Sequence, residues 1–345
     1  MKVLLAAGGT GGHLLPAQAL AERLKRQGHE VFFAGYKLTE SPYFRREGFP
    51  FVDIPSGSLK QKFAFFSGFT RGLFAAFRYL RKMRPDIVVG FGSYHTAPVL
   101  AAAILLRYKL VLYEANRVMG KVNRLCAPFA ERIAIQFPLV GAPSKKAQSV
   151  ALFPWNSSGA PIEKGAARKI LGLDPTLRTI LVFGGSQGAA FLNESLPRVA
   201  SLMPDAQFIH LAGSESAALA VGRSYGAART KIKAFETNMP LAYAAADMAV
   251  CRSGAGTLAE LIRFRVPAVL IPYPHAAEDH QRHNAEYLVE HKAAVCLLQN
   301  SASVSALHRA LEELPCEQIR LALSALAEQN HQRMEDLVYA TAHHT

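Results

Sequence analysis

The sequence has 345 residues, half of them hydrophobic, and a formal net charge of +13. This length and composition exclude a disordered chain and favour two domains over one, because enough apolar residues are present for sizeable cores. The basic excess attracts nucleic acid, anionic membrane or phosphorylated ligands without choosing between them.

The cysteines and the N-terminus also exclude some classes. The four cysteines, Cys126, Cys251, Cys296 and Cys316, form no CxxC pair. A zinc site or a disulfide framework is therefore not expected, and a reducing cytoplasm fits best. The first residues run into a glycine cluster without a charged leader and apolar stretch, so no signal peptide is expected. The longest apolar run, 97–106, is shorter than the about 20 residues that span a bilayer.

Strand and helix signals alternate through the first half of the chain. Lys2–Ala7 is predicted to be a buried strand, and Pro16–Gln27 a helix with Pro16 near its first turn. Further strands are predicted at 30–34, 51–54, 86–89, 110–113 and 132–135. With helical segments between most of them, this pattern is typical of a parallel, doubly wound sheet.

The pattern stops at 136–159, which is rich in Pro, Ser, Lys and Gly, and restarts with a strand at 179–183. Further strands are predicted at 207–211, 231–235, 248–251 and 268–271, and helices from about 304 onward. We therefore expect an α/β chain of two Rossmann-like, doubly wound domains. They comprise residues 1–150 and 151–330, and a C-terminal helix at 331–345 packs back on the first domain.

A glycine-rich loop, Gly8-Gly9-Thr10-Gly11-Gly12-His13, lies between the first strand and the first helix. Glycines let a backbone approach a ligand closely, and a helix N-terminus favours an anion. One or two glycines suffice for a tight turn, whereas four around a threonine suggest a ligand surface. These residues alone leave both interpretations of the loop open. His13 is likewise either a functional residue or a histidine that makes a local hydrogen bond at the helix start.

A nicotinamide or flavin site is the obvious alternative for this loop. The fingerprint G-x-G-x-x-G fails, because counting from Gly9 puts Leu14 where the third glycine belongs. The second strand ends at Gly35 without the acid that would hold an adenosine ribose. A dehydrogenase is therefore not favoured.

Two further glycine loops follow strands of the second half. Gly184–Ala189 offers the Ser186 hydroxyl and backbone amides, which suit a phosphate or the wall of a cleft. Arg252–Thr257 combines an arginine, two hydroxyls and a helix N-terminus, which suit a diphosphate. Glu260 would repel a phosphate, so it is either an acceptor for two ribose hydroxyls or an ordinary solvated glutamate.

Four motifs occur in a fixed order: GGTGGH at 8–13, GGSQGA at 184–189, RSGAGTLAE at 252–260 and DHQRHNA at 279–285. Together they resemble the MurG family of cell-wall glycosyltransferases, within glycosyltransferase family 28, over nearly the whole chain. The segment PDIVVGFGSY at 85–94 is similar to that family's PDVV-G-GGY. Any one motif is weak, but four in order are highly specific.

The resemblance implies the GT-B fold, in which two Rossmann-like domains face a cleft. It implies an inverting, metal-independent transfer of N-acetylglucosamine from UDP-N-acetylglucosamine, with no cofactor. The acceptor would be the muramyl-pentapeptide on pyrophosphoryl-undecaprenol (lipid I), giving lipid II for peptidoglycan at the inner face of the cytoplasmic membrane. Residues 1–150 would then be the acceptor and membrane side, and 151–330 the donor side.

The resemblance also assigns residues. His13 is the candidate base near the acceptor, and Thr10, Gly11 and Gly12 would line the junction of donor and acceptor. Asn116 would reach the sugar from the first domain. Ser186, Ala255, Gly256 and Thr257 would contact the diphosphate of the donor. Glu260 would contact the ribose, Gln281 the sugar hydroxyls, and Leu258 would be a further binding residue.

Two departures from the family pattern stand out. Tyr113-Glu114-Ala115-Asn116 replaces HEQN and keeps only the glutamate and the asparagine. Phe153-Pro154-Trp155-Asn156 replaces NPxR, so the donor-contacting arginine is absent. Such a loss typically costs about 2–4 kcal/mol unless another cation substitutes, and Arg252 is one candidate.

Other functions are compatible with parts of this sequence. Related glycolipid glycosyltransferases and UDP-sugar epimerases share the architecture, and the GGTGGH loop favours the MurG family over both. The missing arginine makes a catalytically weak UDP-sugar-binding scaffold an alternative, although His13, Glu260 and Gln281 are retained. A nucleic-acid reader lacks support, because neither zinc spacing nor an RNP-like aromatic motif is present.

The segment between Ser58 and Pro85 contains no acidic residue and mixes phenylalanines with cations. An apolar stripe at helical spacing, part of which packs on the sheet, comprises Phe66, Phe69, Leu73, Phe77 and Leu80. Three aromatics fall off that stripe: Phe63, Phe65 and Phe74. We expect this surface to enter an anionic lipid leaflet, with contacts from Phe65, Phe66, Phe69 and Arg71.

Overall fold

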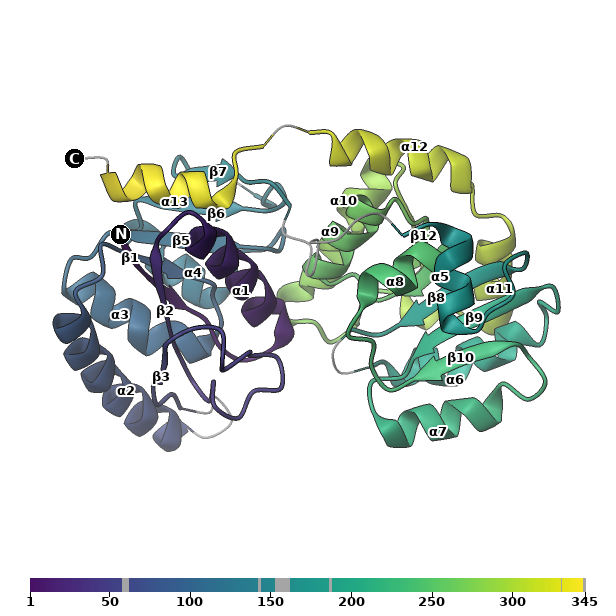
Figure 1. Ribbon diagram of the computed structural model, residues 1–345, viewed down its shortest axis with the longest axis horizontal. Coiled ribbons are helices and arrows are strands. Elements are labelled where there is room, and N and C mark those ends of the chain that lie inside the picture. Colours follow the sequence, from purple (N-terminus) through teal and green to yellow (C-terminus); the bar gives the residue numbers. More distant parts are fainter. Residues whose placement is uncertain (58–61, 142–143, 153–161, 186–187, 330, 344–345) are drawn as a thin grey trace. The chain divides into compact units, whose positions relative to one another are not determined.

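The structure is a computed structural model that describes residues 1–57, 62–141, 144–152, 162–185, 188–329 and 331–343, with only the backbone at 62–66. The chain divides into two compact units. Unit 1 comprises Met1–Phe153 with Asn330–Thr345, and unit 2 comprises Pro154–Gln329. Each unit is a parallel sheet with helices packed on it (Figure 1).

Unit 1 contains a seven-stranded sheet in the order β3-β2-β1-β4-β5-β6-β7. Its strands are β1 (Lys2–Ala6), β2 (Glu30–Gly35), β3 (Phe51–Asp53), β4 (Ile87–Gly90), β5 (Leu110–Glu114), β6 (Arg132–Ile135) and β7 (Ala147–Ser149). All neighbouring pairs are parallel. Because the chain runs outward to β3 and then returns beside β1 as β4, the order reverses between β1 and β4. Ligands of such sheets bind outside the carboxyl ends of the strands at this switch point.

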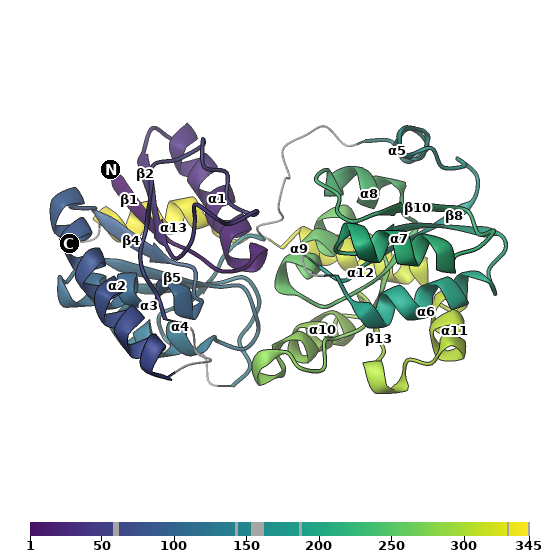
Figure 2. The same cartoon turned by 90° about the horizontal axis from the view of Figure 1, so that it is seen from below.

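The two faces of this sheet bury two separate clusters. Val3 and Leu5 of β1 pack into the cluster under α1 (Gly11–Arg26) and α13 (Met334–His343). Leu4 and Ala6 point into the opposite cluster, as period-two alternation requires. That second face is covered by α2 (Lys62–Met83), α3 (Ala97–Leu105) and α4 (Lys121–Cys126), as Figures 1 and 2 show. The 3₁₀ turns η1 (Tyr94–Thr96) and η2 (Ala127–Phe129) flank α3 and α4.

The first helix begins earlier than the sequence predicts. We expected a start at Pro16, but α1 begins at Gly11, with Thr10 in extended conformation at the N-cap position. Pro16 consequently lies inside the helix and donates no hydrogen bond to the carbonyl four residues back. The glycine loop therefore includes the first turn of α1.

The C-terminal segment belongs to unit 1. Met334, Leu337 and Val338 of α13 are buried in the same cluster as α1. Val150 forms a parallel bridge with Gln332, and the Ala151 amide donates to the Gln332 carbonyl at 2.9 Å. The chain thus leaves and re-enters unit 1 along two adjacent, hydrogen-bonded segments.

In the part of α2 whose side chains the structure describes, one side is buried. Leu80 is fully buried, Leu73 and Phe77 pack partly against the core, and Phe74 is 64% exposed. The Arg78 guanidinium lies 5.8 Å from the ring centroid of Phe74. The side chains of Phe63, Phe65 and Phe66 lie outside the described part. No helix among the described residues is both long and apolar enough to cross a membrane.

Unit 2 contains a six-stranded sheet in the order β10-β9-β8-β11-β12-β13. Its strands are β8 (Arg178–Phe183), β9 (Ala206–Leu211), β10 (Thr230–Lys233), β11 (Met248–Cys251), β12 (Ala268–Leu270) and β13 (Val295–Cys296). All pairs are again parallel, and the order reverses between β8 and β11. Each unit therefore has a switch point of its own.

The helices of unit 2 are α5 (Lys164–Leu171), α6 (Ala190–Ala200), α7 (Glu215–Ser224), α8 (Met239–Ala245), α9 (Ala255–Phe264), α10 (His280–Glu290), α11 (Val304–Glu312) and α12 (Cys316–Ala327). The 3₁₀ turns are η3 (Ala277–Asp279) and η4 (Gln299–Ser301). Helix α9 contacts α8, α10 and α12, whereas α6 contacts α7 and α11. Helix α9 follows β11 directly, so its N-terminus lies at the switch point.

Candidate functional site

The first glycine loop lies at the carboxyl end of β1, at the switch point of unit 1. Gly9 has φ +89, and a Cβ there would meet Cδ2 of His95 at 2.9 Å, so glycine is required. Thr10 and Gly12 are exposed, while Gly11 is buried beneath the loop. The loop thus presents backbone and the positive end of α1 to an approaching anion.

His13 lies in the first turn of α1 and is partly buried. Its Nδ1 lies 2.8 Å from the carbonyl oxygen of Phe91, the residue after β4. A carbonyl only accepts, so Nδ1 must donate, and in the neutral ring Nε2 then holds the lone pair. This is the tautomer that a general base needs, and the backbone of the neighbouring strand fixes it.

The second wall of this site is the loop after β4. His95 stacks on Tyr36 with ring centroids 5.0 Å apart and contacts Tyr94 at 3.9 Å. Its Nδ1 is buried without a hydrogen-bond partner in the described part of the chain. Burial and the nearby His13 lower the pKa of His95 to about 4, so the ring is neutral at physiological pH.

Sequence reasoning missed His95, although it directly follows the quoted motif 85–94. The sequence signal that could have identified it is a histidine immediately after that motif. Its place against Gly9 makes it part of the wall of the glycine loop.

Asn116 follows β5, the strand next to β4, and is held by a buried carboxylate. The Glu114 side chain accepts from the Asn116 backbone amide at 3.1 Å and from Asn116 Nδ2 at 3.3 Å. It also accepts from the Gly120 amide at 2.9 Å and from Asn123 Nδ2 at 3.0 Å. Glu114, which was not singled out as a site residue, therefore shapes the turn that carries Asn116.

At the switch point of unit 2, the loop after β8 approaches the end of β9. Gly188 has φ +69, and a Cβ there would lie 2.4 Å from the Ala212 carbonyl oxygen. Asn193 of α6 donates to the same carbonyl at 3.1 Å and lies 2.9 Å from Nε2 of the fully buried His210. The end of this loop is thus packed against the Ala212 carbonyl, which Asn193 also holds. Ser186 lies outside the described residues.

The loop after β11 leads into α9. Ser253 is buried and donates to the Gln281 carbonyl at 2.7 Å, which ties the loop to α10. Gly256 is exposed and Thr257 is partly exposed at the start of α9. Leu258 is fully buried and its amide donates to Gly254 at 3.0 Å, and the Ala255 side chain is also buried. An anion at this helix start would therefore meet backbone and the Thr257 hydroxyl.

Arg252 is placed differently from the prediction, which assigned it to the diphosphate. Its guanidinium is buried, and one nitrogen donates to the carbonyls of Ile271 and Pro272 at 3.1 Å each. The other nitrogen donates to Gln299 Oε1 at 2.7 Å, and the group lies 5.4 Å from the ring centroid of Tyr273. These donors are committed to ends of β12 and η4, so the expectation that Arg252 substitutes for the missing arginine gains no support.

Glu260 lies in the second turn of α9 and is mostly buried. Its Oε2 accepts from the Tyr243 hydroxyl at 2.8 Å. Burial raises the pKa of the Glu260 carboxyl to about 7, while the Tyr243 hydrogen bond acts in the opposite direction. The group is therefore an acceptor that gains much from further hydrogen-bond donors such as hydroxyls.

Gln281 lies in the first turn of α10. Its Oε1 accepts from the Tyr273 amide at 2.9 Å, which orients the side-chain amide. Within the described ranges its Nε2 has no partner, so it can donate to a sugar oxygen.

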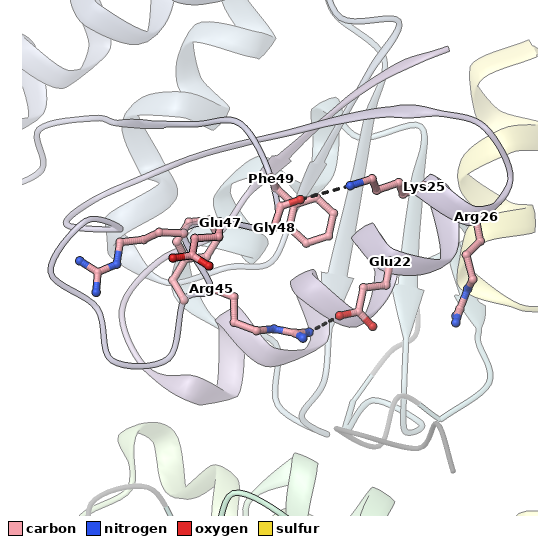
Figure 3. Close-up of a pocket in the computed structure, with 9 residues that line it drawn as sticks. Glu22, Lys25, Arg26, Arg45, Glu47, Gly48 and Phe49 are labelled. Atoms are coloured by element: carbon pink, nitrogen blue, oxygen red, sulfur yellow. Dashed lines mark hydrogen bonds and ion pairs between the residues drawn. The ribbon is translucent and has the colours of Figure 1, made fainter. Parts of the chain in front are cut away.

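A surface hollow of about 860 Å³ lies in unit 1 (Figure 3), and none of the glycine-loop residues is among those that line it. It is lined by the second half of α1 and by residues 44–49, with Arg45 paired to Glu22 and Lys25 5.6 Å from the Phe49 ring centroid. Lys25 lies about 20 Å along the helix from Gly11 at roughly 1.5 Å per residue. We therefore assign the candidate sites to the glycine loops and not to this hollow.

Comparison with known families places both halves of the chain. Residues 3–135 match the glycosyltransferase family 28 N-terminal domain, and residues 179–338 match the glycosyltransferase family 28 C-terminal domain.

Similar curated proteins carry one activity in their names. The chain is 39% identical over 302 residues to the UDP-N-acetylglucosamine–N-acetylmuramyl-(pentapeptide) pyrophosphoryl-undecaprenol N-acetylglucosamine transferase of Protochlamydia amoebophila, covering 84% of this chain and 80% of that protein. It is 37% identical over 330 residues to the transferase of the same name from Nitrosococcus oceani, covering 91% and 89%.

Solved structures agree in fold. The crystal structure of Acinetobacter baumannii MurG is 28% identical, with a TM-score of 0.77, over 98% of this chain and 99% of that one. The spinosyn rhamnosyltransferase SpnG, 17% identical over 99% of both chains with a TM-score of 0.71, shows the fold alone.

Proposed function

This chain belongs to glycosyltransferase family 28, and we propose that it transfers N-acetylglucosamine from UDP-N-acetylglucosamine to the muramyl-pentapeptide of pyrophosphoryl-undecaprenol. The product is lipid II, the precursor of peptidoglycan. The observation that carries the proposal is the single activity named for relatives 37–39% identical over most of the chain.

The acceptor side of the reaction falls to unit 1. His13 takes the proton of the acceptor hydroxyl through Nε2, because Nδ1 is already committed to Phe91. Thr10, Gly11, Gly12 and Asn116 line the same end of the sheet and position the sugar. The support for this arrangement is their shared place at the switch point.

The donor side falls to unit 2. The start of α9, at Gly256 and Thr257, faces the diphosphate and neutralises part of the charge on the leaving UDP. Glu260 accepts from the ribose hydroxyls, and Gln281 Nε2 donates to the sugar. This distribution needs no divalent metal. Ser186 and the segment 153–156 lie outside the described residues. The contact of Ser186 with the diphosphate therefore rests on the family resemblance alone.

The acceptor's lipid carrier requires the enzyme to work at a membrane surface, and we assign docking to α2. Phe74 is exposed, with Arg78 beside it, and Arg71 is exposed on the same helix. Aromatic side chains among cations bind an anionic leaflet reversibly. The protein then acts peripherally on the cytoplasmic face of the inner membrane, and nucleic acid is not a partner.

The test is UDP release measured with and without lipid I. Acceptor-dependent release with appearance of lipid II supports the proposal. UDP release that occurs only with other glycolipids as acceptors would indicate a different glycolipid transferase of this fold. Binding of UDP-N-acetylglucosamine without any release would indicate a sugar-nucleotide scaffold.

A further inference from the structure

Glu260 is hydrogen-bonded to a tyrosine from a different helix. Tyr243 of α8 is 1% exposed, and its hydroxyl donates to Glu260 Oε2 at 2.8 Å. The donor and acceptor come from elements that are separated by β11 in the chain. No sequence motif joins them.

The ring of Tyr243 is held so that its hydroxyl stays in place. It stacks on Phe264 of α9 with centroids 5.0 Å apart and planes 10° from parallel. Phe183, the last residue of β8, meets it edge-on at 5.9 Å. Two aromatic contacts from different elements leave the side chain a single orientation.

The hydroxyl of Tyr243 stays protonated over the pH range in which Glu260 titrates. Burial, and secondarily the Glu260 charge, raises the pKa of the Tyr243 hydroxyl well above its usual range, so it always donates. From β11 the group facing the carboxylate is Cys251, whose thiol pKa burial also raises. On the other packed helices, Arg282 and His283 of α10 bond to Glu286, and Arg320 of α12 bonds to Glu317. Tyr243 is therefore the fixed donor to Glu260.

We propose that Tyr243 is a positioning residue of the donor site: it holds Glu260 through Oε2 and directs Oε1 to the ribose hydroxyls of the uridine nucleotide. The proposal rests on the donor role of Glu260 given above. A neutral hydroxyl that only donates stabilises the charged carboxylate without neutralising it, so the anion is kept as an acceptor in a buried place.

The test is calorimetric binding of UDP-N-acetylglucosamine, without acceptor, by Tyr243→Phe between pH 5.5 and 8.5. The diphosphate of this donor is a diester, so its own charge is constant across that range. Phenylalanine keeps the ring contacts and removes only the donor, so the Glu260 pKa rises further. We expect about five- to tenfold weaker binding near pH 7, with most of the loss recovered at pH 8.5, since one pKa unit corresponds to about tenfold.

Glu260→Gln supplies the control. Its binding should be weak and independent of pH, and adding Tyr243→Phe should weaken it no further, because the tyrosine acts through the carboxylate. A loss in Tyr243→Phe that is equal at every pH, no loss at all, or additive losses in the double variant would overturn the proposal. Wild-type protein that binds the donor but shows no acceptor-dependent UDP release contradicts only the transfer reaction, whereas absence of donor binding overturns both.

Discussion

His13 donates from Nδ1 to the Phe91 carbonyl, and this single bond leaves Nε2 as the nitrogen for the proposed role as base. We expect His13→Ala to lower turnover at saturating substrates by about 10²–10⁴-fold, the usual range for loss of a general base. The measurement is the steady-state rate of lipid II formation. His29→Ala, a change to another histidine of unit 1 that stacks on Tyr339, should retain turnover. Near-normal turnover of His13→Ala would remove His13 from the mechanism.

Glu260 imposes a stability cost that Gln would relieve. Its folded-state pKa of about 7 lies above the ordinary value of 4.5, so the folded protein binds more protons between these values. Stability contributed by the neutral form is therefore present below about pH 4.5 and lost as pH rises through 7. We expect Glu260→Gln to be more stable than the wild type by about 3 kcal/mol at pH 8 and similar at pH 4. Thermal melting of the ligand-free proteins at both pH values tests this, and a lower melting temperature at pH 8 would contradict it.

The sequence could place His13 and the first glycine loop at the end of β1, because that motif is contiguous and follows a clear strand. It could not find Tyr243, which meets Glu260 only through the fold. His95 was missed although it follows the motif at 85–94, because its place against Gly9 is set by the fold. Arg252 was assigned to an anion because arginine beside a glycine loop suggests one. Its actual acceptors, the Ile271 and Pro272 carbonyls, come from the next strand's end and leave no mark in the motif.

Among the elements, α2 offers the clearest test of membrane docking. We expect salt-sensitive binding to vesicles that contain anionic lipid, because each cation near the surface contributes about 1 kcal/mol. Joint replacement of Phe65, Phe66 and Arg71 should weaken this binding in a vesicle sedimentation assay, and adding Phe74→Ser should weaken it further.

The matched control is Leu321→Ser, which removes an apolar side chain that is 73% exposed in unit 2. It should leave vesicle binding unchanged. Equal binding to neutral and anionic vesicles, or full binding by the α2 variants, would assign these aromatics to packing within unit 1.

Most strands could be predicted within a residue or two because their apolar runs are bounded by turn residues. The edge strands β7 (Ala147–Ser149) and β13 (Val295–Cys296) were missed, since β7 reads Ala-Gln-Ser without a bulky apolar residue and β13 has only two residues. The start of α1 was placed too late because Gly11 and Gly12 weaken the helical signal, although the chain is already helical there.

At the scale of the whole molecule, both units follow one plan. When strands are counted from the first strand of each unit, both sheets contain the order 3-2-1-4-5, and a glycine loop lies where the order reverses. Unit 1 is completed only by α13, whose Met334, Leu337 and Val338 are buried. At about 2 kcal/mol for each buried apolar side chain, their loss approaches the stability of a typical domain.

We therefore expect a chain ending at Gln329 to lose the unfolding transition of unit 1 in calorimetry while unit 2 still binds UDP-N-acetylglucosamine. Removing only residues 344–345 is the control and should change neither property. A truncated chain that keeps both transitions and full lipid II synthesis would show that α13 is dispensable.

The return of α13 to unit 1 also sets an order of events during synthesis on the ribosome. The sheet of unit 1 leaves the ribosome first, but the helix that covers part of its α1 face follows only after residues 154–329 have been made. At roughly 5–20 residues per second, this interval is on the order of ten seconds or more. Throughout it the apolar patch that Met334, Leu337 and Val338 later cover is open, while unit 2, continuous in sequence, can fold. The N-terminal half of the nascent chain thus exposes an apolar patch for the whole interval, and unit 2 can complete its fold before unit 1 does.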